Sequence, residues 1–242
     1  MDGTTESIIV VIGDPIAGNP VQFAAERALR SLRLDWRVLS FDVKPEHVAT
    51  ALGGFDVTGI DGVFVDPSLC DQAREWLAAR NEVKPESIDS LYRDDQGQFV
   101  GANEQREWID EQIARHGGDR RVWIGDHGPN AAATCEGFEM HDNVPSDLGE
   151  VTANADVIVI SDRAGKPVEL EPDEWADNDG GTLVIDLTNG HPDFSRIKQR
   201  GYRVVCENER RIGTLQRSLH RWTGEYASAD VIHDAIEEYL SV

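Results

Sequence analysis

The sequence predicts an α/β protein of two domains, and three observations predict it. Short β-branched runs alternate with stretches of helical periodicity along the 242 residues, which is how a parallel sheet covered by helices appears in sequence. A charged amphipathic helix over residues 104–115, ended by a Gly-Gly pair, separates two sets of strands. We therefore expect one domain over residues 1–103 and another over residues 104–212, with the chain crossing back near Gly213.

The first domain alternates strands and helices and then forms a hairpin. Residues 8–12 are β-branched and end at Gly13, and the next segment places apolar residues three or four positions apart, as a helix does. Pro45 suits the first turn of a second helix. A four-residue turn at 94–97 predicts a hairpin. The predicted strands are 8–12, 36–41, 63–65, 87–93 and 98–102, and the predicted helices are 20–32, 45–52 and 72–79.

The second domain is predicted to hold strands at 121–124, 156–160, 183–186 and 203–205. A short helix at 193–199 precedes the last of these strands, so this half is also α/β, with fewer helices. The chain closes with helices at about 211–222 and 228–240, the latter with Ser228 as its N-cap.

Acidic residues dominate the composition. The chain has 23 Lys and Arg against 45 Asp and Glu, which gives a formal net charge of −22. Such a surface repels a phosphate backbone, so we expect no nucleic-acid partner. No apolar run approaches the ~18 residues of a membrane span, so we expect no membrane partner either.

Cysteine and histidine usage gives no metal or disulfide signal. The three cysteines lie far apart and form no Cys-x-x-Cys pair. The ligand-type residues His127, Cys135, His141 and Asp142 fit no zinc spacing, so we expect no metal. The N-terminus lacks the basic start and apolar core of a signal peptide, and we expect a cytoplasmic protein.

Four short strings occur in a fixed order along the chain: 13–17 after the first strand, Ser87 to Arg93 in the hairpin, Gly101-Ala102-Asn103 after it, and Trp222-Thr223-Gly224 near the end. Their order and spacing resemble the shikimate dehydrogenase family. The resemblance implies a substrate domain, a reduced Rossmann-like domain, and C-terminal helices over 213–242 that pack back on the first domain. It also implies the family reaction, the NADP-linked interconversion of 3-dehydroshikimate and shikimate.

The acid–base pair of that family is missing from this chain. The family has a lysine after an Asn-Val-Thr-x-Pro run, where residues 62–69 contain none, and an aspartate where this chain has Gln105. In the family these groups move the hydroxyl proton during hydride transfer, and an amide cannot replace a carboxylate in that role. The resemblance therefore predicts a divergent member without the family's catalytic residues.

Substrate contacts are altered as well. The family's serine pair, which binds the substrate carboxylate, would fall where this chain has Asn19-Pro20. The hairpin asparagine of the family corresponds to Asp89, whose charge would repel an anionic substrate. Asn103 keeps the family's polar group, and it also suits the N-cap of the following helix. By resemblance, the substrate-binding candidates are Asn103, Asp89, Gln105 and Thr214.

Residues 125–129 occupy the place of a dinucleotide-binding loop, in which glycines let backbone N–H groups reach a pyrophosphate. Gly125 and Gly128 are the candidate cofactor-binding residues. His127 replaces a middle glycine, Asp126 adds negative charge, and the helix that follows can extend only from about 129 to 136. We therefore expect binding of the family's cofactor, NADP, to be weak or lost.

Three interpretations of function remain. The first is an active NAD(P)-dependent shikimate or quinate oxidoreductase that uses other residues. The second is a catalytically degenerate relative that binds a small molecule. The third is an interaction protein, whose partner is another protein or a second copy of itself. We favour the second and third, because the acid–base pair, the substrate contacts and the phosphate loop are all altered.

Overall fold

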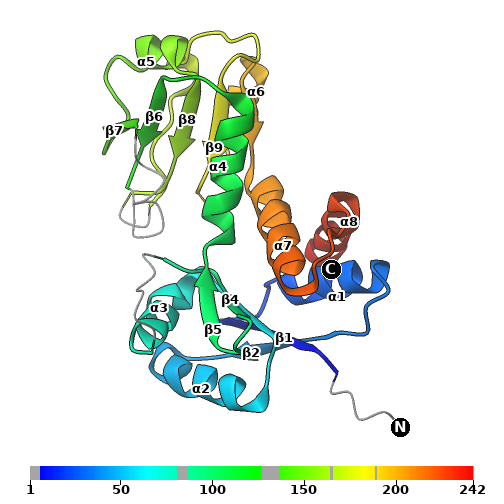
Figure 1. Ribbon diagram of the computed structural model, residues 1–242. Helices are drawn as coiled ribbons and strands as arrows, with labels where there is room; N and C mark the ends of the chain where they lie inside the picture. Colours follow the sequence, from blue (N-terminus) through cyan, green and yellow to red (C-terminus); the bar gives the residue numbers. More distant parts are fainter. Residues whose placement is uncertain (1–5, 81–86, 127–136, 164–165, 189, 242) are drawn as a thin grey trace. The chain divides into compact units, whose positions relative to one another are not determined.

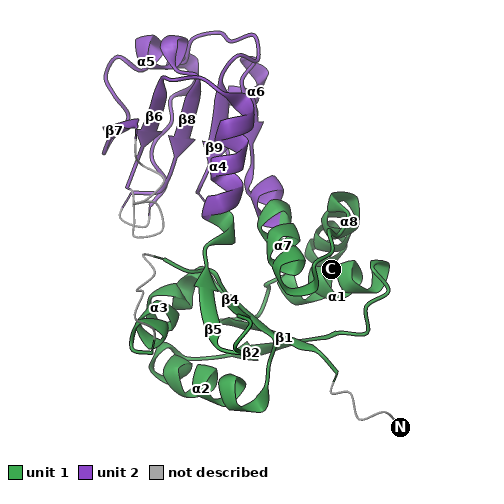
Figure 2. Ribbon diagram, viewed as in Figure 1, with its two compact units in different colours: residues 1–105, 212–242 green, residues 106–211 purple. Residues whose placement is uncertain are grey.

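The computed structural model describes residues 6–80, 87–126, 137–163, 166–188 and 190–241. The chain forms two compact units (Figure 2): unit 1 comprises residues 1–105 and 212–242, and unit 2 comprises residues 106–211. Each unit has its own five-stranded sheet, so the strands that begin at Ile8 and Arg121 do not share one. The predicted two-domain α/β fold class is confirmed.

The sheet of unit 1 has the strand order β2-β1-β3-β4-β5, of which Figure 1 labels β1, β2, β4 and β5. The first three of these strands are parallel, whereas β4 and β5 form the predicted antiparallel hairpin next to β3. The strands are β1 (Ile8–Gly13), β2 (Arg37–Asp42), β3 (Gly62–Val65), β4 (Ser90–Arg93) and β5 (Phe99–Ala102).

Helices cover both faces of this sheet, and the alternation of β1 side chains shows how. Val10 and Ile12 pack in the core under α2 and α3, whereas Ile9 and Val11 pack in the core under α1, α7 and α8. The C-terminal helices therefore pack on the first unit, as predicted. The helices are α1 (Val21–Ser31), α2 (Val48–Thr58), α3 (Cys70–Ala78), α4 (Glu104–His116), α7 (Glu207–Thr223) and α8 (Ala229–Leu240), of which α4 and α7 each contribute residues to both units.

Helix α2 is longer than the sequence predicts. A 3₁₀ turn at Pro45–His47 precedes it, and the helix continues through Gly53 and Gly54 to Thr58. Two glycines weaken a helix, and the predicted helix ends at Leu52, directly before them. Packing of Phe55 against the core extends it, and Gly59 then ends it in the left-handed conformation.

Unit 2 is a fully parallel sheet with the strand order β10-β9-β8-β6-β7. Counted along the chain this is the doubly wound order 2-1-3-4-5, which places the topological switch point between β6 and β8. Helix α4 covers one face through Ile109 and Ile113, and α5 and α6 cover the other. The elements are β6 (Arg121–Ile124), β7 (Phe138–His141), α5 (Leu148–Asn154), β8 (Val157–Ile160), β9 (Leu183–Asp186), α6 (Phe194–Gln199) and β10 (Arg203–Val205).

Two elements of unit 2 were missed by the sequence analysis, β7 and α5. Both are short, four and seven residues, and β7 is incompletely buried, so neither has a periodic apolar pattern. The helix expected at about 129–136 lies outside the described residues. Among the described residues, no helix combines the length and the hydropathy needed to cross a bilayer.

Candidate functional site

Asp89 holds the first turn of α4 in unit 1. The hairpin register sets Ser90 opposite Ala102, so the residue before β4 lies next to the start of the helix that follows β5. The Asp89 carboxylate accepts the backbone N–H of Glu104 (2.9 Å) and of Gln105 (2.7 Å). A carboxylate at this position satisfies amides that have no partner within the helix and complements the positive end of the helix dipole.

Burial raises the pKa of Asp89 to about 6, and the nearby Glu104 carboxylate adds to the increase. The two backbone N–H groups act in the opposite direction, because they stabilise the charged form. The folded protein therefore keeps the Asp89 proton at a higher pH than the unfolded chain does.

We expect the stability that Asp89 contributes to depend on pH in a defined direction. Because the pKa is raised in the folded state, the contribution is fully present below about pH 4 and is lost as pH rises through 6. Relative to an Asp89→Asn variant, the wild type should lose about 2–3 kcal/mol of unfolding free energy between pH 4 and pH 7. Urea unfolding of both proteins across this range measures it; parallel profiles would contradict it.

Of the other three predicted substrate residues, two lie near Asp89 and one lies on α7. Asn103 donates through Nδ2 to Ser87 Oγ, and the Gln105 backbone N–H binds Asp89. Thr214 lies on α7, where its Oγ1 is buried and has no hydrogen-bond partner among the described residues. Asp89, Asn103 and Gln105 are brought together at the start of α4.

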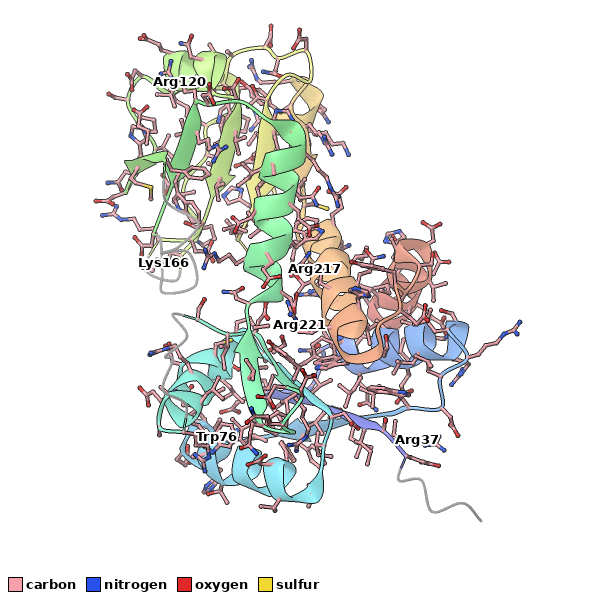
Figure 3. The ribbon with its side chains drawn as sticks, in the orientation of Figure 1. Arg37, Trp76, Arg120, Lys166, Arg217 and Arg221 are labelled. Atoms are coloured by element: carbon pink, nitrogen blue, oxygen red, sulfur yellow. The ribbon has the colours of Figure 1, made fainter. Side chains whose placement is uncertain are left out.

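A buried carboxylate bridges two arginines of α7 in the same unit. The Glu104 side chain is 1% exposed; its Oε2 accepts from Arg217 Nε at 3.2 Å and its Oε1 from Arg221 Nε. Arg217 and Arg221 are one helical turn apart and both reach the N-terminal end of α4 (Figure 3). Because removal of a charge from water is costly, this carboxylate depends on its partners.

These residues line a pocket of about 260 Å³ within unit 1. Its other walls are His220 and Tyr226, whose rings stack with centroids 3.7 Å apart. His220 Nδ1 is buried and has no hydrogen-bond partner among the described residues. The pocket therefore combines guanidinium groups, a carboxylate and an aromatic stack, a mixture of polar and flat surfaces that suits a small polar molecule.

The segment that matches the family's lysine run forms an internal network instead. Asp66 accepts from the backbone N–H (3.0 Å) and hydroxyl (2.8 Å) of Ser68, and it also accepts from Asn19 Nδ2 (3.1 Å). Leu69 is fully buried in the core. Asn19 lies where the resemblance puts the family's serine pair, so this hydrogen bond joins the two segments to each other.

In unit 2, the loop after β6 uses its backbone groups within the protein. Gly125 N–H donates to the His141 carbonyl (2.9 Å) and Asp126 N–H to the Asp162 carbonyl (3.1 Å). Gly125 has φ of +108°, and a Cβ there would lie 2.1 Å from the Ser161 carbonyl oxygen. Position 125 therefore requires glycine because Ser161, the residue after β8, lies too close for a side chain. Gly128, the second candidate, lies outside the described residues.

The carboxyl ends of the central strands of unit 2 carry acidic residues. Asp126 follows β6, Asp162 follows β8, and Asp186 ends β9. Asp186 is buried and accepts from the backbone N–H (2.8 Å) and hydroxyl (2.6 Å) of Thr188, and burial raises its pKa. Arg210 provides a cation that interacts with Asp162 and Asp186. An edge with this charge disfavours a pyrophosphate at the switch point.

Solved structures match the chain over almost its whole length. A ligand-free 5-ketofructose reductase of Gluconobacter sp. strain CHM43 has a TM-score of 0.76 at 14% identity and covers 98% of this chain and 99% of its own. The shikimate 5-dehydrogenase of Thermus thermophilus, in complex with shikimate, has a TM-score of 0.75 at 18% identity, with 98% and 100% covered. The chain has the shikimate dehydrogenase fold. No protein-family model matches the sequence, and no curated protein matches it.

A shikimate 5-dehydrogenase-like protein also matches, with a TM-score of 0.74 and 14% identity over the full length of both chains. The shikimate dehydrogenase fold thus accommodates this sequence despite low identity. Sequence reasoning missed Glu104, Arg217 and Arg221 as a group. The spacing of four between the arginines was a signal that both lie on one face of a helix, but nothing in the sequence pointed to Glu104 as their partner.

Proposed function

We propose that this protein is a catalytically degenerate form of the shikimate dehydrogenase fold that binds a small molecule in the pocket of unit 1. The observation that carries the proposal is the network of Asn19, Asp66 and Ser68. It uses the side chains of both segments that match the family's substrate-binding and proton-transfer motifs. Neither segment then supplies the ammonium group that carbonyl reduction in the family requires.

The unit 2 loop supports the same proposal. A phosphate-binding loop acts through backbone N–H groups that point at the ligand, whereas Gly125 and Asp126 donate theirs to His141 and Asp162. Aspartates at the ends of β6, β8 and β9 add repulsion. NADP binding is weak or lost in this proposal, and the ligand is a small molecule held by unit 1.

The pocket favours a hydroxylated carboxylic acid as ligand. Arginine presents planar donors that match a carboxylate, and Arg217 and Arg221 both line the pocket. The stacked rings of His220 and Tyr226 offer a flat surface to a ring or a carbon chain. Shikimate and quinate have this chemistry and serve as probes.

We expect millimolar shikimate or quinate to raise the thermal unfolding midpoint of the wild type, because a ligand that binds only the folded state stabilises it. A Tyr226→Ala variant should lose most of this increase. Tyr226 is 66% exposed, so its removal should cost little stability on its own. Differential scanning fluorimetry measures both effects.

Val57→Ala is the matched control, since Val57 is 85% exposed and does not line the pocket. It should keep the full increase. An equal increase in wild type and Tyr226→Ala would place binding elsewhere, and no increase with either probe in the wild type would contradict the proposed ligand class.

A further inference from the structure

Strand β2 forms an edge of the unit 1 sheet and, in the described part of the chain, pairs with β1 alone. Arg37 N–H donates to the Ser7 carbonyl (2.9 Å) and Val43 N–H to the Gly13 carbonyl (3.0 Å), so the odd-numbered residues direct their backbone groups to β1. The backbone N–H and C=O groups of successive residues point to opposite sides of a strand, so the N–H and C=O groups of Val38, Ser40 and Asp42 point away from β1. An outward row of donors and acceptors is a template for another strand.

Two of the exposed side chains of β2 are large and apolar. Leu39 and Phe41 are each 41% exposed, on the face opposite Val38, which is buried in the core with α1. The Phe41 ring lies 5.7 Å from that of Phe55, so the apolar surface continues onto α2. Edge strands are usually protected by a central charge, a proline or a bulge. In β2 the charged residues, Arg37 and Asp42, stand only at the ends (Figure 3 labels Arg37).

We propose that β2 pairs with β2 of a second copy of this chain, antiparallel and centred on Ser40, so that the two unit 1 sheets become continuous. This symmetric use of one surface by both copies is the usual arrangement of a homodimer. The backbone groups of Ser40 would exchange both hydrogen bonds with Ser40 of the second copy, and those of Val38 would bind Asp42 of the second copy.

Side-chain complementarity selects this register. The two-fold axis of such a dimer is perpendicular to the sheet, so residues that lie opposite each other point to the same face. The axis therefore passes beside one residue of β2, which lies opposite itself in the second copy. Centring on Ser40 places Leu39 opposite Phe41 of the second copy, twice, in the non-hydrogen-bonded pairs where side chains are closest. Centring on Leu39 would instead set Arg37 opposite Phe41. Centring on Phe41 would set Val38 opposite Lys44, outside β2. The Ser40 register therefore covers both exposed apolar side chains and also pairs all three outward residues, Val38, Ser40 and Asp42, within β2.

The charge of the chain does not oppose this pairing locally. Arg37 binds Glu6 (2.9 Å) and Lys44 binds Asp14 (2.5 Å), so the charged residues that flank the edge form pairs within one chain. The strand itself contains one arginine and one aspartate. The Val38 carbonyl accepts from Gln22 Nε2 (3.2 Å), but a carbonyl has two lone pairs and can accept a second bond.

The test is the mass in solution, measured by analytical ultracentrifugation of the full chain at about 1–100 µM, the range in which standard interfaces associate. The wild type should have twice the 26.8 kDa of one chain. Ser40→Pro removes an outward N–H that β1 does not use, and a proline is tolerated at such an edge position; this variant should be monomeric. Ser40→Ala keeps the N–H and is the matched control, which should stay dimeric.

Leu39→Lys is a second, independent variant, because it places a charge opposite Phe41 without changing the backbone; it should also be monomeric. Circular dichroism of each variant shows whether the fold is kept. A monomeric wild type at 100 µM, about the upper end of the range tested, would overturn the proposal, and so would folded Ser40→Pro and Leu39→Lys proteins that remain dimeric. If Ser40→Ala is monomeric as well, the dimer depends on the Ser40 hydroxyl and not on the backbone N–H, and this result would also overturn the proposed strand pairing.

Discussion

Purified protein mixed with shikimate or quinate and either NADP⁺ or NAD⁺ should produce no reduced nicotinamide above a turnover of about 0.1 s⁻¹, roughly 10²-fold below the median enzyme. Oxidation of the carbinol needs a group that takes the hydroxyl proton, and such a group typically contributes about 10²–10⁴-fold. After Pro67 the chain offers Ser68, which is bonded to Asp66, and Leu69, which is buried.

Lys44, the lysine that the described residues of unit 1 contain, does not replace the missing proton-transfer group, because it is paired with Asp14. A Gln105→Asp variant should therefore be as inactive as the wild type, because it restores the carboxylate without its ammonium partner. Absorbance at the nicotinamide band measures turnover, with an active shikimate dehydrogenase as the positive control. Turnover near 1 s⁻¹, or a dissociation constant for NADP⁺ in the low micromolar range by calorimetry, would show that other residues perform the chemistry.

The parts of the fold that the sequence predicts are those whose pattern is local. The β-branched run at Ile8–Gly13 and the helix at Val21–Ser31 each have a clear period, and both are where we expected them. Strand β7 and helix α5 were missed because each is too short to have a period and is held by contacts with β6 and the unit 2 core.

The candidate site in unit 1 could be predicted from local sequence patterns even less than the fold. The sequence predicts an Asp89 carboxylate that repels an anionic substrate, whereas the hairpin register turns it toward the backbone N–H groups of Glu104 and Gln105. Glu104 lies 113 residues from Arg217 and 117 from Arg221 along the chain, so only the folded structure brings them together. Local patterns therefore identify which segments differ from the family, but not which side chains replace the lost groups.

Replacement of Glu104 should destabilise unit 1 strongly, although the residue belongs to no apolar core. Glu104→Ala leaves two guanidinium groups, 19% and 28% exposed, without the carboxylate that neutralises them. Removal of one partner of a buried ion pair costs about 3–5 kcal/mol, a large share of the ~5–15 kcal/mol that stabilises a typical domain. Chemical denaturation followed by circular dichroism measures the loss.

Two comparisons separate the loss of the buried charge from the loss of any carboxylate. Glu237→Ala removes a carboxylate that pairs with His233 at 3.2 Å on the surface of the same unit, where its side chain is 63% exposed, and should cost less than about 1 kcal/mol.

Conversely, replacing Glu104, Arg217 and Arg221 together by leucine should cost less than Glu104→Ala alone, because the two guanidinium groups are then removed together with the carboxylate. If Glu104→Ala costs no more than Glu237→Ala, the three side chains do not stabilise the contact between α4 and α7. If instead the triple variant is the least stable of the three, the paired charges are net stabilising and the expected order is wrong.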